Sequence, residues 1–343
     1  MQKKEGMEFH IEPGQEWEVD LFRPEDADGV VKLFLSVYGK DYPVRTYIDA
    51  ELLTRENSTG RVISAVARTP RGDIVGHDAL FCSAPYAGIR ESGAGAVHAN
   101  YRGGQGIFTQ MVARGAEEGA KRFGVEAVYG EAVCNHVFSQ KMTHSLGWIS
   151  YAMEVDLMPD SAYRKEGSAA GRVASIFDLI TYKPKPHKVF IPHVYEDACS
   201  FLYSGLDDRR EISKAGGSAS SDSVTRIQTE YFGFSQVSRT AVWEIGSDFE
   251  AVFEAEEKKA LDQGAIVLQV WLNLSFQWVD AAVHVLREKG FFLGGILPRW
   301  FDHDGLLMQK IMKEPDWESV QIHFDRAKRI RDLVYEDWRR VSV

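Results

Sequence analysis

The residues best suited to chemistry lie between an apolar run and an amphipathic run, at Arg102-Gly103-Gly104-Gln105-Gly106. Glycines let successive backbone N–H groups point inward with no Cβ atom in the way, and an arginine can bind phosphate oxygens through two parallel hydrogen bonds. A helix that begins at Ile107 adds the positive end of its dipole. This spacing indicates a phosphate-binding turn, and the alternative is an ordinary turn that needs left-handed glycines.

A phosphate-binding turn needs a strand that ends at it and a helix that follows it, and the neighbouring sequence supplies both. Residues 92–99 predict a strand, and residues 107–123 predict a helix with Gly124 as its C-cap. Thr69-Pro-Arg-Gly72 predicts a hairpin turn. The other elements expected in this half are strands over 17–22, 61–68, 73–82, 125–133 and 150–158 and helices over 24–38, 45–55 and 136–146.

The second half of the chain repeats short features of the first half. Phe34-Leu-x-x-Tyr-Gly39 is echoed by Phe201-Leu-Tyr-Ser-Gly205, and Leu146-Gly-Trp148 by Lys289-Gly-Phe291. We therefore predict a second, divergent copy of the same unit, reached through a connection at 160–188 that holds a strand over 172–182. The expected domains are 1–160 and 161–343. The elements expected in the second copy are strands over 224–232, 236–245, 265–272, 291–297 and 306–312 and helices over 249–263 and 276–289.

The order of these elements, together with two motifs, resembles the GNAT superfamily of acyl-CoA-dependent N-acetyltransferases. The first motif is Val97-x-Ala99-x-Tyr101-Arg102-Gly103-Gly104-Gln105-Gly106-Ile107, similar to V-x-P-x-Y-R-G-x-G-[IL]-[GA]. The second is Asn135…Ser139-Gln-Lys…Leu146-Gly147-Trp148, similar to N…S…LGF. Ala99 replaces the usual proline, one glycine is extra, and Phe108 replaces a small residue. The resemblance implies a mixed α/β fold with two tandem GNAT-type three-layer αβα units and mixed, mostly antiparallel sheets.

The resemblance also implies where coenzyme A would bind. Backbone groups of Val97 and Ala99 would pair with the pantetheine amides, and the glycine loop would hold the pyrophosphate. Asn135 and Ser139 lie where the family contacts coenzyme A from the following helix, although N-terminal capping of that helix is an alternative role. The expected contacts are Val97, Ala99, Arg102, Gly103, Gly104, Gln105, Gly106, Ile107, Asn135 and Ser139. No metal is expected.

The family reaction is direct attack of an amine on the acetyl thioester, which requires a base and an acid. Glu91 lies six residues before Val97, where one branch of the family places its glutamate base, and Glu131 and His98 are weaker alternatives. The position that often holds a tyrosine acid is Thr143, a poor acid. We expect His136, His144 or water to protonate the thiolate instead. Cys134 is expected to be a buried strand residue.

The second half lacks a matching phosphate loop. The corresponding stretch, 244–250, has one glycine, no basic residue and three carboxylates, which would repel a pyrophosphate. We therefore expect the first half to transfer acetyl from acetyl-CoA to a small-molecule or peptide amine. The alternative is a catalytically silent acyl-CoA-binding regulator. Trp243, Trp271, Trp278 and Trp300 of the second half are candidates for an acceptor wall, with core packing as the other reading.

Composition limits the remaining possibilities. The chain of 343 residues carries a net charge of −10, which argues against nucleic-acid and anionic-membrane partners. Three cysteines without CxxC spacing favour a reducing, cytoplasmic compartment. Neither a signal sequence nor a membrane span is expected. The basic run at 326–331 is expected to form one face of an amphipathic helix, and the sequence does not predict the oligomeric state.

Overall fold

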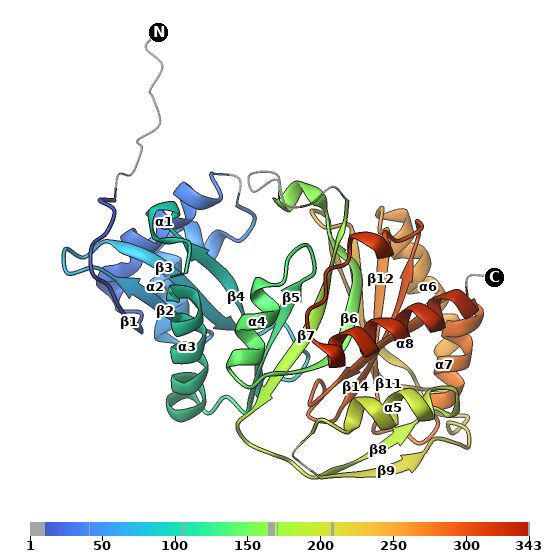
Figure 1. The fold of residues 1–343 in the computed structure, drawn as a ribbon. Coiled ribbons are helices and arrows are strands. Elements are labelled where there is room, and N and C mark those ends of the chain that lie inside the picture. Colours follow the sequence, from blue (N-terminus) through green and yellow to red (C-terminus); the bar gives the residue numbers. More distant parts are fainter. Residues whose placement is uncertain are drawn as a thin grey trace. The chain divides into compact units, whose positions relative to one another are not determined.

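The computed structural model describes residues 11–40, 42–104, 106–163, 169, 171–206 and 209–341. The chain divides into two compact units, Met1–Val128 and Tyr129–Val343, called unit 1 and unit 2 below. Figure 1 shows helices and strands in both units, as expected for a mixed α/β fold. The expected domain boundary at 160/161 was placed from the sequence repeat, whereas the two units are defined by their compactness. The boundary therefore stays a prediction.

Unit 1 contains an antiparallel sheet in the order β1-β2-β3-β4. Successive strand residues point to opposite faces of a sheet, and the two faces here carry different cores. Val66 of β2 packs with α1 residues, whereas its neighbours Ala65 and Ala67 pack with Ile107 and Met111 of α3. The elements are β1 (Glu18–Leu21), α1 (Ala27–Val37), α2 (Ala50–Ser58), β2 (Val62–Arg68), β3 (Ile74–Phe81), β4 (Ile89–Val97) and α3 (Ile107–Phe123).

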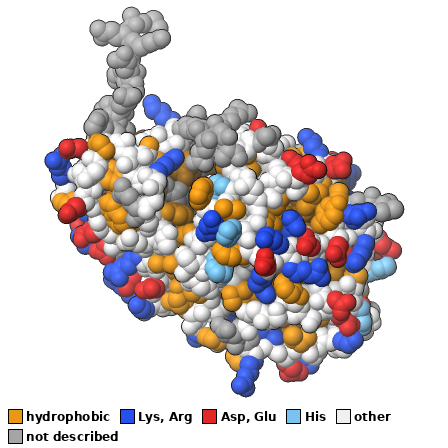
Figure 2. Space-filling view, in the orientation of Figure 1, with side chains coloured by type: hydrophobic (Ala, Val, Ile, Leu, Met, Phe, Trp, Pro, Cys, Tyr) orange, Lys and Arg blue, Asp and Glu red, His pale blue; other side chains and the backbone are white. Residues whose placement is uncertain are grey.

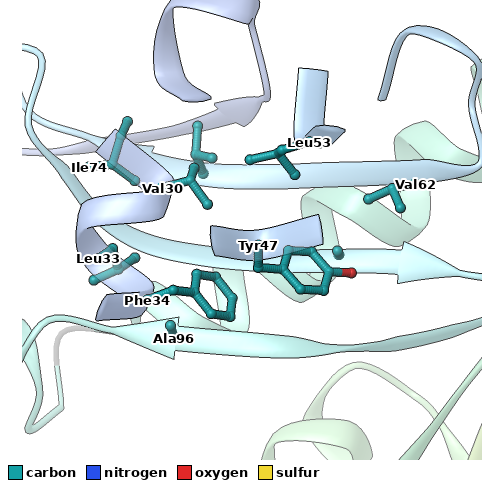
Figure 3. Packing of buried hydrophobic residues seen from close by; sticks show 10 residues of the cluster. Val30, Leu33, Phe34, Tyr47, Leu53, Val62, Ile74 and Ala96 are labelled. Carbon is teal, nitrogen blue, oxygen red and sulfur yellow. The ribbon is translucent and has the colours of Figure 1, made fainter. Parts of the chain in front are cut away.

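The core on the α1 side is built around aromatic rings. Figure 3 shows Phe34 of α1 beside Tyr47, with Ala96 of β4 beneath. The rings of Phe34 and Tyr47 stack with centroids 5.0 Å apart, and both side chains are buried. On the other face, α3 ends where the sequence predicts, with Gly124 in the left-handed region at φ 71°.

Unit 2 contains one large mixed sheet in the order β5-β7-β6-β13-β14-β12-β11-β10. Two segments of it have the same connectivity: β5-α4-β6-β7 and β12-α7-β13-β14 each place the last strand between the other two. These two segments therefore share one connectivity, and the predicted repeat of the whole unit stays a prediction. The elements are β5 (Ala127–Val133), α4 (Phe138–Ser145), β6 (Ile149–Met158), β7 (Val173–Thr181), β10 (Arg226–Phe232), β11 (Val237–Glu244), α6 (Phe249–Asp262), β12 (Val267–Asn273), α7 (Val279–Glu288), β13 (Phe292–Leu297) and β14 (Gly305–Ile311).

One expectation for this region was incomplete. The strand predicted inside the 160–188 connection is β7, and it pairs with β6 from Ile149↔Leu179 to Met158↔Val173. Seven of its nine residues are buried, so it is a central strand rather than part of a linker. Its Val-Ala-Ser-Ile-Phe sequence is that of a strand buried on both faces, which lacks the alternation that marks a half-exposed strand.

The two segments with the same connectivity meet where β6 pairs with β13, at Gly295↔Ala152. Gly295 has φ 136°, and a Cβ atom at this position would lie 2.4 Å from the carbonyl oxygen of Tyr151. The buried side chain of Gln309 continues the pairing, because its amide donates to the carbonyl of Met153 and its carbonyl accepts from the N–H of Val155, both at 2.9 Å. Only glycine fits this close approach of two backbones.

The sheet of unit 2 is strongly curved. Arg239 of β11 and Glu131 of β5 lie 2.7 Å apart, although five strands separate β11 from β5 in the sheet. In a flat sheet six strand spacings would cover about 29 Å. The sheet therefore curls until its inner face encloses these side chains, as strand sheets do in barrels.

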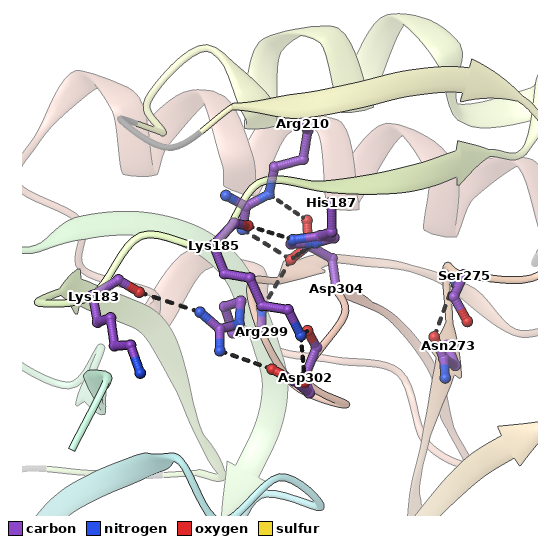
Figure 4. A network of polar contacts seen from close by, with 9 residues as sticks. All are labelled: Lys183, Lys185, His187, Arg210, Asn273, Ser275, Arg299, Asp302 and Asp304. Atoms are coloured by element: carbon purple, nitrogen blue, oxygen red, sulfur yellow. Dashed lines mark hydrogen bonds and ion pairs between the residues drawn. The ribbon is translucent and has the colours of Figure 1, made fainter. Parts of the chain in front are cut away.

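A second, two-stranded parallel sheet in unit 2 was not predicted from the sequence. It pairs β8 (His187–Ile191) with β9 (Arg210–Lys214), and α5 (Glu196–Tyr203) lies between them in the chain. Figure 4 shows how buried Asp304 ties this sheet to the turn between β13 and β14. Arg210 donates to both Asp304 oxygens at 2.9 Å, and the ring of His187 lies 3.1 Å from the same carboxylate. These bonds lower the pKa of Asp304 despite its burial.

The chain ends in α8 (Asp325–Val341), which is amphipathic as expected. Ala327, Ile330 and Val334 are buried on one face, while Lys328 and Arg329 pair with acidic residues of the same helix. Asp337 is the buried polar residue of α8, and it accepts from Arg287 and from the N–H of Leu293. The helix is thus fixed to α7 and β13.

We predict that Gly295→Ala destabilises the protein by about 2–4 kcal/mol, because it combines a steric clash with left-handed backbone strain. Chemical unfolding would measure the effect. Gly216→Ala is the matched control, since a Cβ atom there meets nothing within 4 Å. Equal stability of the two variants would contradict the role given to Gly295.

Candidate functional site

The predicted phosphate loop lies between β4 and α3, and its first residues are firmly anchored. After β4 the chain forms a short 3-10 helix, Ala99–Tyr101. Tyr101 is buried, and its hydroxyl donates to the carbonyl of Glu12 at 2.6 Å. The side chain of Asn100 donates to the carbonyl of Ile11 at 3.0 Å. The loop therefore starts from a fixed point.

The loop itself has the backbone that a phosphate cradle needs. Gly103, Gly104 and Gly106 have φ angles of 95°, 104° and 72°, all in the left-handed region. A Cβ atom added at Gly103 or Gly104 would meet nothing within 4 Å, so the loop surface is open. Gly106 offers α3 no side-chain cap, and the first turn of α3 contains no acidic residue. This helix start favours an anion. Gln105 lies outside the described residues.

Arg102 is exposed and folds back onto the end of β4. Its Nε donates to the carbonyl oxygen of Val97 at 2.9 Å. This carbonyl is one of the backbone groups predicted to pair with a pantetheine amide. An amide bound there would have to replace Arg102, which would then be available for phosphate oxygens next to Gly103.

Phe108 stands where the family motif has a small residue, and the structure shows how its ring is accommodated. The ring packs with the cluster of Tyr101, Ile107 and Met111. Gly95 of β4 leaves the necessary space, because a Cβ atom there would lie 2.4 Å from Phe108 Cε2. Gly95 thus makes room for the ring of Phe108.

The candidate base Glu91 lies on β4 and accepts a hydrogen bond from the Ser83 hydroxyl. It is partly exposed and faces the α1 side of the sheet, near Tyr42. Burial raises the pKa of Tyr42, and the charges of Tyr38 and Glu91 raise it further. Glu91 is therefore a carboxylate at the edge of an aromatic surface, close to the middle of β4.

Asp78 of β3 is a titratable residue that the sequence reasoning missed. It is buried, and burial raises the pKa of its carboxyl to about 8, although the Ser92 hydroxyl donates to it at 3.0 Å. The signal in the sequence was a charged residue inside the apolar strand run 74–81. A buried carboxyl beside β4 is protonated at neutral pH and can donate a hydrogen bond.

The other predicted coenzyme A contacts, Asn135 and Ser139, lie in unit 2. Asn135 is buried, and its carbonyl accepts from the Gln321 side chain at 3.1 Å. The Ser139 hydroxyl is also buried. Gln140 donates to the carbonyl of Gln321 at 2.8 Å, so the segment before α8 covers the start of α4. Their roles as ligand contacts stay predictions.

The candidate acids also lie in unit 2. His136 accepts from the N–H of Phe138 at 3.3 Å, and the ring of His144 stacks on Phe324 with centroids 3.8 Å apart. Thr143, at the position that often holds a tyrosine acid, is buried and donates to Asp178 at 2.5 Å. Burial raises the pKa of Cys134 to about 12, so this thiol is not nucleophilic.

Glu131, the weaker candidate base, belongs to a polar network. Arg239 donates to Glu131 at 2.7 Å and to buried Glu154 at 3.1 Å, and Gln269 donates to Glu154 at 2.9 Å. Burial raises the pKa of Glu154, and the charge of Glu131 raises it further. The arginine compensates both carboxylates, so Glu131 is already engaged within unit 2.

The stretch that corresponds to the loop in the second copy is filled by the chain itself. A Cβ atom at Gly246 would lie 2.4 Å from the backbone nitrogen of Thr225. The N–H of Gly246 donates to the Thr225 hydroxyl at 3.0 Å, and the N–H of Ser247 donates to the carbonyl of Ser223 at 3.1 Å. Asp248 accepts from the N–H of Thr225 at 2.8 Å. The backbone donors at 246–247 thus have internal partners.

Comparisons with known proteins find similarity at the level of fold. No protein-family model matches the sequence, and no curated protein matches it either. The structure is similar to ribosomal-protein-S5-alanine acetyltransferase from Vibrio fischeri, with 12% identity and a TM-score of 0.38 over 50% of this chain and 95% of that chain. It is also similar to a protein from Salmonella typhimurium solved with its cofactor acetyl-CoA, with 14% identity and a TM-score of 0.39 over 50% and 96%.

Mutant forms of the spermidine/spermine N-acetyltransferase from Vibrio cholerae match with 11% identity and a TM-score of 0.38, over 48% of this chain and 95% of that chain. At these TM-scores the matches say what the chain is similar to and carry no argument about its activity.

Acidic and basic side chains are intermixed on the face shown in Figure 2. Within the described residues, no helix is long and apolar enough to cross a membrane. The same residues contain no group of three or more His, Cys, Asp or Glu side chains that could hold a metal ion.

We predict that Asp78→Asn removes a pH dependence of stability. Between pH 3.8 and about 8 the folded state keeps a proton on Asp78 that the unfolded state has lost, so the free energy of unfolding falls as pH rises. The fall is at most about 1.4 kcal/mol per pH unit. Urea unfolding of both proteins at pH 5, 6.5 and 8 would show the wild type losing stability relative to Asp78→Asn.

The measurement compares the free energy of unfolding of the wild type with that of Asp78→Asn at each pH, because His77 titrates in both proteins. Burial lowers the pKa of His77 to about 4, which acts in the opposite direction. Parallel pH profiles would mean that Asp78 is ionised in the folded protein.

Proposed function

We propose that the protein is an N-acetyltransferase that transfers acetyl from acetyl-CoA to an amine by direct attack, with its active site in the N-terminal half. Acetyl-CoA is the cosubstrate, and the acceptor is a small-molecule or peptide amine. The observation that carries the proposal is the open loop with three left-handed glycines between β4 and α3. Arg102 and the start of α3 supply the positive charge that a pyrophosphate needs.

The difference between the loop at 103–106 and the corresponding stretch at 244–250 supports an active site in the N-terminal half. Gly103 and Gly104 leave their surroundings open, whereas the chain at 223–225 fills the space around Gly246. The backbone donors at 246–247 already have partners, and Asp248 places a carboxylate at the start of α6. Carboxylates there repel a pyrophosphate, so coenzyme A is expected at one loop per chain.

The chemistry follows from the residues of β4. The amine nitrogen attacks the thioester carbonyl carbon, the carbonyl oxygen becomes negative, and the carbon–sulfur bond then breaks to release the thiolate. Glu91 accepts the amine proton, directly or through water. Water protonates the thiolate, because Thr143 is held by Asp178 and is a poor acid. No covalent enzyme intermediate is needed.

A second candidate function is a silent acyl-CoA-binding regulator. The specific observation in its favour is Thr143, which stands where a tyrosine acid is usual and is buried against Asp178. A protein with this function would bind acyl-CoA at the glycine loop without catalysing acyl transfer. The second copy would then serve as a structural partner. Trp271 and Trp300 pack against each other at 5.0 Å in its interior, in agreement with a core role.

We predict that Arg102→Glu weakens the binding of acetyl-CoA and CoA by about 100-fold, because a charge-assisted hydrogen bond is replaced by repulsion. Isothermal calorimetry at two salt concentrations would measure the change. Arg122→Glu is the matched control, since Arg122 is exposed at the other end of α3 and carries the same charge change.

Binding without turnover on a broad amine panel would favour the regulator. Absence of binding by the wild type would contradict both candidate functions. Equal affinities of Arg102→Glu and the wild type would remove Arg102 from the phosphate site.

We predict that Glu91→Gln lowers kcat by about 100-fold, because general-base catalysis contributes a factor of this order, while the affinity for acetyl-CoA stays the same. A thiol-release assay across pH would also lose the limb in which one carboxylate must be ionised. Glu18→Gln is the control, an exposed carboxylate on β1 of the same unit. A variant as fast as the wild type would place the base elsewhere.

A further inference from the structure

The last strand of the large sheet in unit 2, β10, has an open outer edge. β10 pairs with β11 on one side, from Ile227↔Val242 to Phe232↔Val237. Within the residues that the structure describes, no strand pairs with its other side. Backbone N–H and C=O groups along such an edge can pair with a further strand, so soluble proteins usually shorten, twist or cover their edges. β10 spans seven residues and is longer than an average strand, so its edge is not shortened.

One face of β10 carries a row of exposed side chains. Arg226, Gln228, Glu230 and Phe232 are exposed, whereas the residues between them are half-buried. Val224, two residues before the strand, continues this exposed series and is 69% exposed. The exposed row thus has charged side chains on either side of an amide, and an apolar side chain at each end.

The exposed row is complementary to itself. Two copies of one strand can pair antiparallel about a two-fold axis, and when the faces of the joined sheets continue, residues pair symmetrically about a central residue. With Gln228 at the centre, Arg226 of one copy lies opposite Glu230 of the other, and the axis produces this pair twice. Val224 lies opposite Phe232 in the same way. Each charge therefore meets an opposite charge, and each apolar side chain meets another apolar one.

The neighbouring strand β11 continues this charge pattern. Arg226 lies opposite Glu244 and donates to it at 2.9 Å, and Glu230 lies opposite Arg239. Across two joined sheets the row would read Glu244 and Arg226 from one copy, then Glu230 and Arg239 from the other. The signs alternate along this row, so each inner charge lies between two opposite charges. An exposed ion pair contributes little when it is isolated, and more when it belongs to such a network.

Other edge strands in the described part of the chain lack this property. On β1 the charged residues Glu18 and Asp20 are both acidic, so symmetric pairing would bring like charges together. On β9, pairing about the central residue Ile212 would place Arg210 opposite Lys214. Like charges directly opposite each other destabilise a strand pair. The self-complementary pattern is therefore specific to β10 among these three strands.

We propose that β10 is the surface through which two copies of this chain form a dimer, with the two β10 strands paired antiparallel about Gln228. The occupant is a second copy because the charged and apolar side chains of β10 match their own symmetric image. Main-chain hydrogen bonds supply affinity in such strand addition, and the side-chain pairs set the register. The inference concerns unit 2 and does not depend on the proposed acyl transfer.

The test uses two single charge reversals, Arg226→Glu and Glu230→Arg. Each variant alone places like charges opposite each other twice, so we expect the dissociation constant of the dimer to rise about 10-fold or more. An equimolar mixture of the two variants restores the dimer, because the two reversed side chains then face each other. Analytical ultracentrifugation over a concentration series would measure the mass against that of the 38.6 kDa chain. Lys214→Glu is the matched control, an exposed charge on β9.

The mixture separates a broken interface from a damaged fold, because both chains in it are the same as in the separate samples. Recovery of the dimer on mixing supports the proposal. A wild type that stays monomeric over the whole concentration series overturns it. Single variants that dimerise as well as the wild type also overturn it, as do variants that stay monomeric when they are mixed.

Cross-linking tests the register of the pairing. The variants are made in a Cys82→Ser background, because Cys82 is exposed. A short thiol-reactive cross-linker is expected to join two chains that carry Gln228→Cys, since the two-fold axis places these side chains next to each other. Ile212→Cys on β9 is the control, an exposed position on another edge strand. Cross-linking of both variants, or of neither, would overturn the pairing about Gln228.

Discussion

The close approach of two backbones at Gly295 and Ala152 is the constraint on which unit 2 depends. It joins β6 to β13 and so merges the strands β5-β7-β6 and β13-β14-β12 into one sheet. The pairing is short, and the buried amide of Gln309 extends it by bonding to Met153 and Val155. A side chain can replace missing ladder bonds in this way because its amide offers the same donor and acceptor as a peptide group. The repeats are therefore fused by hydrogen bonds as well as by apolar packing.

Fusion of the two sheets has an electrostatic consequence. The combined sheet curls, and strands that are distant in the sheet bring Arg239, Glu131 and Glu154 together. Burying Glu154 beside the partly exposed Glu131 costs free energy that a single shared arginine must offset, together with the donors Gln269 and Ser175. Such a network specifies how the two copies meet, because any other alignment would leave a buried charge without its partner.

The two strand-to-helix turns that follow β4 and β11 have different surroundings. The turn after β4 is open and has left-handed glycines, whereas residues 223–225 cover the turn after β11. Backbone N–H groups at such a turn can either be available to bind an anion or donate hydrogen bonds within the chain. The strand before the open loop carries a bulge at Ala94, and the aromatic cluster of α1 packs beside it. Binding and chemistry thus concentrate on β4 in the proposed function.

The sequence by itself determined the order of most elements, because apolar periodicity and glycine caps act locally, but it did not predict β8, α5 and β9. The loop at 102–106, the cap at Gly124 and the repeated helix-to-strand turns at Gly147 and Gly290 were all readable, and each glycine has a positive φ where the structure describes it. The pairing partners were not readable, since they join residues far apart in the chain. Only the tertiary structure decided that β7 is central, that Gly95 makes room for Phe108, and that Asp78 is buried beside β4. Each of these depends on which side chain faces a given strand, and that is fixed by sheet register and packing rather than by local sequence.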